Sequence, residues 1–124
     1  MAATIHRTVA RAALRAEFSA PAQALASALQ RLDAATQSAW ATGLPVDALA
    51  NATPYLQAFG HLVLAWIWLD VALVAPADPA SPAQLGRLQA CRYFFDYELP
   101  KIDPWLGVVA SRNPTCRAMQ DDWF

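Results

Sequence analysis

Residues 55–75, YLQAFGHLVLAWIWLDVALVA, form the most apolar part of the chain and decide its fold. Their larger side chains repeat at spacings of three and four, the period of one helical face; this stripe consists of Tyr55, Phe59, Leu62, Trp66, Leu69 and Leu73. Val63, Ile67 and Val74 widen it until the helix is apolar on most of its circumference. Such a helix is typical of a core position, so we expect it at the centre of an all-α domain.

The same stretch is a poor candidate for a membrane span. The apolar run from Leu62 to Ala75 is shorter than the roughly 20 residues that a bilayer requires, and it contains Asp70. Extending the run backward adds His61 and Gln57. Because unpaired carboxylates are rare at bilayer depth, we expect no membrane span.

Turn signals upstream predict a helix before this one. Ser19 is a suitable cap and Pro21 suits the first turn of a helix that runs to about Thr42, where Gly43 and Pro45 end it. Its buried stripe is expected at Leu25, Leu29, Leu32 and Trp40. The central helix then begins near Val46 and ends near Ala75, with Asp47 as its cap and Pro54 bending or restarting it.

Turn signals downstream predict two further helices. A surface loop is expected at Pro76, Asp78 and Pro79, with Ser81 and Pro82 capping a third helix that runs to about Leu99. Pro100 and Pro104 then break the chain before a shorter fourth helix that stops near Asn113. The prediction is an antiparallel bundle of about four helices over residues 19–124, preceded by an N-terminal arm or short helix over residues 1–18.

Composition limits the classes of function. The chain has 124 residues, of which 56% are hydrophobic and 15% charged, with a net charge of −1. This is enough to form one packed domain, but it offers no broad basic field for nucleic acid. The N-terminal arginines Arg7, Arg11 and Arg15 form a stripe at helical spacing and interrupt any secretory signal. We therefore expect a cytoplasmic protein whose two cysteines are reduced, and no nucleic-acid partner.

Catalytic residue types are sparse. The sequence has two glutamates, Glu17 and Glu98, and two histidines, His6 and His61, without the ExxH pattern of di-iron bundles. It has none of the glycine-rich phosphate-binding motifs and no GxSxG element. We predict no catalytic, cofactor-binding or metal-binding residue in this chain.

Two polar residues interrupt the apolar helix and are candidates for buried polar groups. Asp70 needs a partner, for which an arginine such as Arg92, a tyrosine hydroxyl or water is expected. His61 is expected to be a hydrogen-bonded histidine at the helix surface or in the core. Asp70 and His61 lie nine residues apart, on opposite helical faces, which ranks an enzyme centred on them last.

Surplus aromatic side chains are the best indication of a protein partner. Trp66 and Trp68 are too close in sequence to share one helical face, so at least one of them is expected off the core stripe. Trp123 and Phe124 are costly to leave in water, and we expect them to dock on the bundle or on a partner. These four residues are the predicted interface.

The string LANATPYLQAFGHLVLAWIWLDVAL from Leu49, followed later by CRYFFDYELPKI, resembles the extra C-terminal domain of a subgroup of acyl-CoA dehydrogenases. The most specific residues are Asn51 to Leu56, then Tyr93 to Phe95 with the break at Leu99 and Pro100, then Asp121 to Phe124. The resemblance covers roughly residues 19–124. It implies a link to FAD-dependent oxidation of an acyl-CoA thioester, in which the whole enzyme uses a glutamate base. Neither that base nor the FAD-binding domains match anything in this chain.

Two functions follow as expectations. The first is an accessory or oligomerisation domain that packs on an acyl-CoA dehydrogenase core or pairs with itself as a homodimer. The second is a free-standing bundle that binds an acyl chain or another small hydrophobic ligand in a cavity lined by Phe59, Trp66 and Phe95. The sequence leaves open whether the domain acts within a longer chain or as a separate subunit.

Overall fold

The computed structural model describes residues 1–76 and 81–124, and all regular structure in these residues is helical. The α-helices are α1 (Ala2–Ala13), α2 (Ser19–Ala39), α3 (Pro45–Leu49), α4 (Ala52–Val74), α5 (Pro82–Tyr93) and α6 (Ile102–Ala110). Short helical turns are η1 (Ala16–Phe18), η2 (Phe94–Glu98), η3 (Leu99–Lys101) and η4 (Asp121–Trp123). The predicted all-α bundle of about four helices is confirmed.

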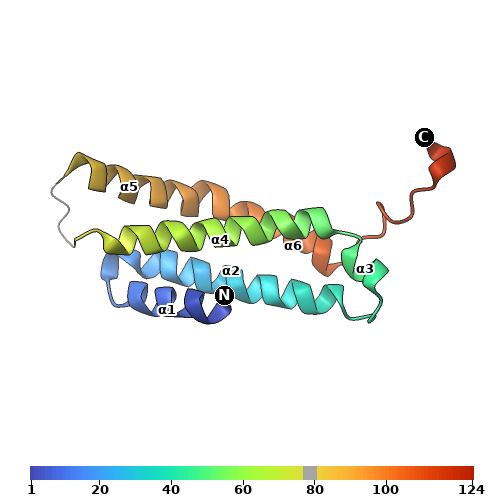
Figure 1. Cartoon of the computed structure of the whole chain (residues 1–124), viewed down its shortest axis with the longest axis horizontal. Coiled ribbons are helices and arrows are strands. Elements are labelled where there is room, and N and C mark those ends of the chain that lie inside the picture. The colour runs from blue at the N-terminus through green and yellow to red at the C-terminus, as the bar shows by residue number, and fades with distance from the viewer. Residues whose placement is uncertain (77–80) are drawn as a thin grey trace.

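Helix α4 lies in the middle of the bundle (Figure 1). It has α1 and α2 on one side and α5 and α6 on the other, and it runs antiparallel to α2 and α5. By length and composition alone α4 is also apolar enough to cross a membrane. In this structure α4 instead packs against four other helices. It therefore lies at the centre of the bundle, as the sequence predicts.

The buried positions of α2 and α4 are alanine and leucine rather than aromatic residues. The buried positions of α4 are Ala58, Leu62, Ala65, Leu69 and Ala72, and those of α2 are Ala22, Leu25, Ala28, Leu32, Ala35 and Ala39. Small side chains let two helix backbones approach each other closely, and bulky ones fill the space beside that contact. The predicted stripes were therefore only partly right. In the α4 stripe Leu62 and Leu69 are buried, but Tyr55, Phe59 and Trp66 are only partly buried. In the α2 stripe Trp40 is 48% exposed.

The predicted central helix is split in two near its start. Helices α3 and α4 are separated at Ala50 and Asn51, and Pro54 lies in the first turn of α4. The Asn51 backbone leaves the helical region at φ −121° and ψ 38°, and its buried side-chain amide donates to the carbonyl of Asn113, 3.1 Å away. The helix therefore restarts near Pro54, as predicted. The hydrogen bond from Asn51 to Asn113 stabilises this break.

Helix α5 begins as predicted and then continues further than predicted. Ser81 and Gln84 form a capping box, with Pro82 in the first turn; the expected loop residues Asp78 and Pro79 lie outside the described residues. The break expected at Pro100 and Pro104 is wrong, because the chain stays helical through η2 and η3 into α6. The wider turn of η2 lets the amide of Leu99 bond to Phe94, five residues back, and places Pro100 where a helix tolerates proline.

The two ends of the chain differ in how they relate to the bundle. Within residues 1–18, helix α1 buries Ile5, Thr8 and Ala12 in the same core as α2 and α4. The C-terminal segment leaves the bundle beside α3 (Figure 1). Trp123 is 64% exposed and Phe124 is 94% exposed, so neither docks on its own bundle.

Candidate interaction surface

The side of α4 that points away from the core is also apolar. Its exposed members are Leu56, Leu64, Ile67, Val71 and Val74, whose exposed fractions range from 40% to 79%. They recur at spacings of three, four and eight, so they share one helical face with Gly60. We call this set the α4 outer face. A soluble protein rarely leaves such a continuous apolar strip in water unless a partner covers it.

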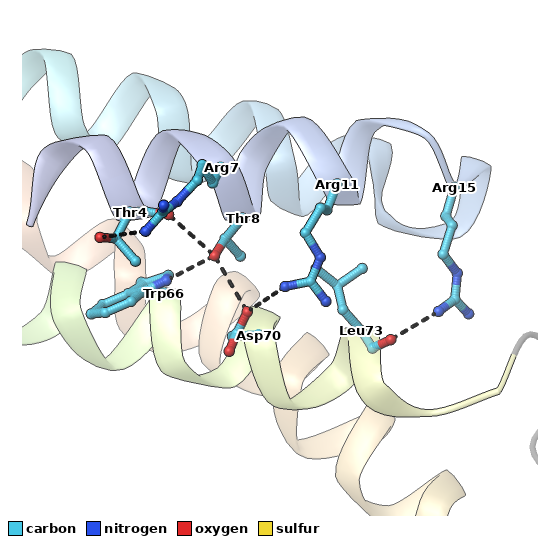
Figure 2. Close-up of polar contacts among 8 residues, drawn as sticks. All are labelled: Thr4, Arg7, Thr8, Arg11, Arg15, Trp66, Asp70 and Leu73. Atoms are coloured by element: carbon cyan, nitrogen blue, oxygen red, sulfur yellow. Dashed lines mark hydrogen bonds and ion pairs between the residues drawn. The ribbon is translucent and has the colours of Figure 1, made fainter.

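A polar seam between α1 and α4 borders one edge of the α4 outer face (Figure 2). The indole N–H of Trp66 donates to the hydroxyl of Thr8 at 3.0 Å. That hydroxyl donates in turn to Asp70 at 3.3 Å or to the carbonyl of Thr4 at 3.4 Å. Thr8 is 3% exposed, so this seam satisfies polar groups that water does not reach.

Asp70 takes its charge partner from α1. A guanidinium nitrogen of Arg11 lies 3.2 Å from its carboxylate oxygen, and the Asp70 side chain is 47% exposed. An arginine such as Arg92, a tyrosine hydroxyl or water was expected; the partner is an arginine, but it is Arg11, and Arg92 lines a cleft beside α2 and α5. Asp70 is therefore a half-exposed residue of the seam, and its place on α4 is explained by packing against α1.

Arg15 closes the end of the same seam. Its guanidinium donates to the carbonyls of Leu73 and Ala75 at 3.4 and 3.1 Å, where the last carbonyls of α4 lack helical partners. It also pairs with Glu17 at 2.6 Å and lies over the ring of Phe18. A backbone hydrogen bond and then Arg15 hold the pKa of Glu17 below its usual value. Two of the three arginines of the stripe seen in the sequence, Arg11 and Arg15, thus join the N-terminal segment to α4.

His61 lies at the opposite edge of α4. One ring nitrogen is 3.1 Å from the carbonyl of Gln57 and the other is 3.4 Å from a carboxylate oxygen of Glu98. The ring also packs edge-on against Trp105. Lys101 bonds both oxygens of Glu98 and, with His61, holds the pKa of that carboxyl below its usual value. The structure keeps His61 and Asp70 apart, on the two edges of α4.

The predicted interface residues fall into two groups. Trp66 and Trp68 are partly buried and pack against the core. Trp123 and Phe124 are exposed on the C-terminal segment. Their contact with a partner stays a prediction. Sequence reasoning missed the α4 outer face, because both sides of α4 are apolar and only the packing shows which side is left exposed.

Two neighbouring clefts lie between the start of α2 and α5. The larger has a volume of about 490 Å³ and is lined mainly by Phe18, Pro21, Leu85, Leu88 and Cys91. Phe95 borders the smaller cleft of about 320 Å³. The predicted ligand cavity joined Phe95 with Phe59 and Trp66, but neither of these two lines either cleft.

The structure also places the two cysteines and the helical glycines. Both cysteines are free: Cys91 is buried, which raises its pKa to about 11, and Cys116 is exposed. Gly60, Gly86 and Gly107 lie inside helices and so form no phosphate-binding loop. Among residues 1–76 and 81–124, no three His, Cys, Asp or Glu side chains are grouped so that they could hold a metal ion.

Comparison with known proteins gives one match. The family model described as acetyl-CoA dehydrogenase C-terminal like matches residues 1–120. No curated protein and no solved structure matches the chain. The match includes α1 as well as the bundle from residue 19 onward, and it ends just before η4.

Proposed function

This chain belongs to the acetyl-CoA dehydrogenase C-terminal-like family, and from that premise we propose that it is an accessory domain of an FAD-dependent acyl-CoA dehydrogenase in the cytoplasm. In this proposal the domain packs on the dehydrogenase core or on a neighbouring subunit and helps to assemble the enzyme that oxidises acyl-CoA thioesters. The core supplies FAD and the glutamate base. The observation that carries the proposal is the α4 outer face, an apolar strip that residues 1–76 and 81–124 leave exposed.

The α4 outer face is suited to a packing contact rather than to chemistry. Its exposed members are leucine, isoleucine and valine, with Gly60 among them, so it offers close van der Waals contact and no group that transfers a proton. A partner helix could lie along much of the 23-residue length of α4. The core holds α4 from the opposite side and the polar seam holds it along one edge, so the face is pre-formed before binding.

Light scattering of the purified chain, alone and mixed with the FAD-containing core of an acyl-CoA dehydrogenase from the same source, tests the proposal. We expect a complex with the core or a stable oligomer that includes this chain. A monomer that remains a monomer in the mixture would contradict the accessory-domain function.

The clefts between α2 and α5 favour a second candidate function, binding of an acyl chain. The larger cleft is mainly apolar, and its lining includes the Arg15–Glu17 pair and Arg92, where an anionic headgroup could bind to Arg92. Titration with a fluorescent fatty acid tests this function, with Leu88→Glu as the variant that blocks the cleft. Binding that Leu88→Glu does not weaken would rule out this cleft as the site.

A further inference from the structure

The charged residues of the helices on both sides of the α4 outer face are all arginines. Helix α1 contains Arg7 and Arg11 and no acidic residue, and helix α5 contains Arg87 and Arg92 and no acidic residue. Among residues 1–76 and 81–124, Asp70 on α4 and Glu98, which contacts His61 of α4, are each paired with a cation. A surface that covers this face therefore meets excess positive charge at its edges.

Arg7 and Arg11 lie on the α1 edge of the face. Arg11 reaches Asp70 on α4 and still keeps 58% of its side chain exposed. Arg7 lies one turn earlier on α1, and its guanidinium donates to the hydroxyl of Thr4 at 3.3 Å, a neutral acceptor (Figure 2). A guanidinium bonded only to a hydroxyl keeps its full charge for an incoming carboxylate.

Arg87 lies on the α5 edge. Arg87 precedes Phe94 by seven residues, or about two helical turns. Their side chains therefore point from the helix in nearly the same direction. The ring of Phe94 lies 5.9 Å from the ring of His61 on α4, which identifies that side as the one toward α4. Arg92 instead lines the clefts beside Pro21 of α2, on the other side of α5.

This distribution of charge disfavours a second copy of the chain as the partner. If two copies paired antiparallel through their α4 outer faces, the α1 helices would meet each other across the two-fold axis. If they paired parallel, α1 of one copy would meet α5 of the other. Both arrangements place arginines next to arginines, and like charges across an interface suppress association.

We propose that the α4 outer face binds an apolar helix of the dehydrogenase core that carries carboxylates along both of its edges, opposite Arg7 and Arg87. The inference rests on the proposed function and specifies the partner surface within it. The apolar strip provides the buried contact, and the two rows of charge fix the register and exclude self-pairing.

The test is the affinity of the chain for the FAD-containing core of an acyl-CoA dehydrogenase from the same source, measured by calorimetry at low and at physiological ionic strength. Three proteins are compared: the unaltered chain, the double variant Arg7→Glu with Arg87→Glu, and the control Arg92→Glu. We expect the double variant to bind roughly tenfold more weakly at low salt and to lose most of the salt dependence. The control should bind like the unaltered chain.

The outcomes separate the two proposals. If the core binds but the double variant and the control behave alike, the charge inference is wrong and the accessory function stands. If the core does not bind at all, the accessory function fails and the inference fails with it. Binding to vesicles of phosphatidylcholine and phosphatidylserine that the double variant abolishes would assign the face to an anionic membrane and overturn the inference. A homodimer that the double variant leaves intact would also overturn it.

Discussion

Trp66 and Thr8 lie 58 residues apart in the chain, and the indole N–H of Trp66 donates to the hydroxyl of Thr8 at 3.0 Å. This bond joins the first helix of the chain to its central helix. The same hydroxyl reaches Asp70, which Arg11 holds from the next turn of α1. The seam therefore fixes the side of α4 that faces α1 and leaves the α4 outer face open.

Loss of the Thr8 hydroxyl should destabilise the fold. In Thr8→Val the side-chain volume is kept, but the indole N–H of Trp66 loses its acceptor in a buried position. We expect the free energy of unfolding, measured with urea, to fall by about 1–2 kcal/mol. Thr8→Ser keeps the acceptor and should cost less. Equal stability of Thr8→Val and the unaltered protein would show that the seam does not hold α1 on α4.

Loss of Arg15 should loosen the end of α4. Arg15→Met keeps much of the packing of the side-chain stem but removes the donors to the carbonyls of Leu73 and Ala75. We expect a loss of about 1 kcal/mol in the free energy of unfolding and faster amide exchange in the last turn of α4. Arg87→Met, which changes an exposed arginine of α5, is the control and should leave both quantities unchanged.

Acid should weaken the contact between α4 and η2. The pKa of Glu98 is lowered in the folded protein, chiefly by the hydrogen bond from Lys101 and also by His61. Its stabilising contribution is therefore complete above the pKa of the unfolded chain, near 4.3, and is lost as the pH falls through the lower folded value. We expect Glu98→Gln and Lys101→Met to flatten the acid limb of the stability curve. Circular dichroism against pH measures this, and an unchanged limb in both variants would contradict the pairing.

The two thiols should react at very different rates. Cys116 is exposed, whereas Cys91 is buried and burial raises its pKa to about 11, so it is protonated at mildly alkaline pH. We expect one fast-reacting thiol with a disulfide reagent in the native protein and two after unfolding in urea. Cys116→Ser should remove the fast phase. A fast phase that survives this substitution would place Cys91 near solvent.

The sequence predicted those parts of the fold that depend on local pattern. The apolar period identified α4 as the central helix, and Ser81 followed by Pro82 located the start of α5. The break at Asn51 depends on a hydrogen bond to Asn113, 62 residues away, which no local pattern contains. The continuation through Pro100 depends on the wider turn of η2, which was not signalled by the spacing of apolar residues.

The candidate site was harder to predict, for a related reason. The partner of Asp70 is Arg11, in a segment that the sequence reading placed outside the bundle, and the contact spans 59 residues. The α4 outer face is apolar like the buried face of α4, although it carries isoleucine and valine where the buried face carries alanine. Only the positions of α1, α2, α5 and α6 around α4 decide which residues remain exposed.

The most direct test of the α4 outer face compares the same substitution at two valines of similar exposure. Val71 on α4 is 40% exposed and Val108 on α6 is 38% exposed. Each is changed to glutamate, and the affinity for the FAD-containing core of an acyl-CoA dehydrogenase from the same source is measured by calorimetry. We expect Val71→Glu to weaken binding roughly 100-fold, because a charge would be buried at the contact, and Val108→Glu to bind like the unaltered chain. Equal affinities of the two variants, with both folded, would contradict the assignment of the α4 outer face as the docking surface.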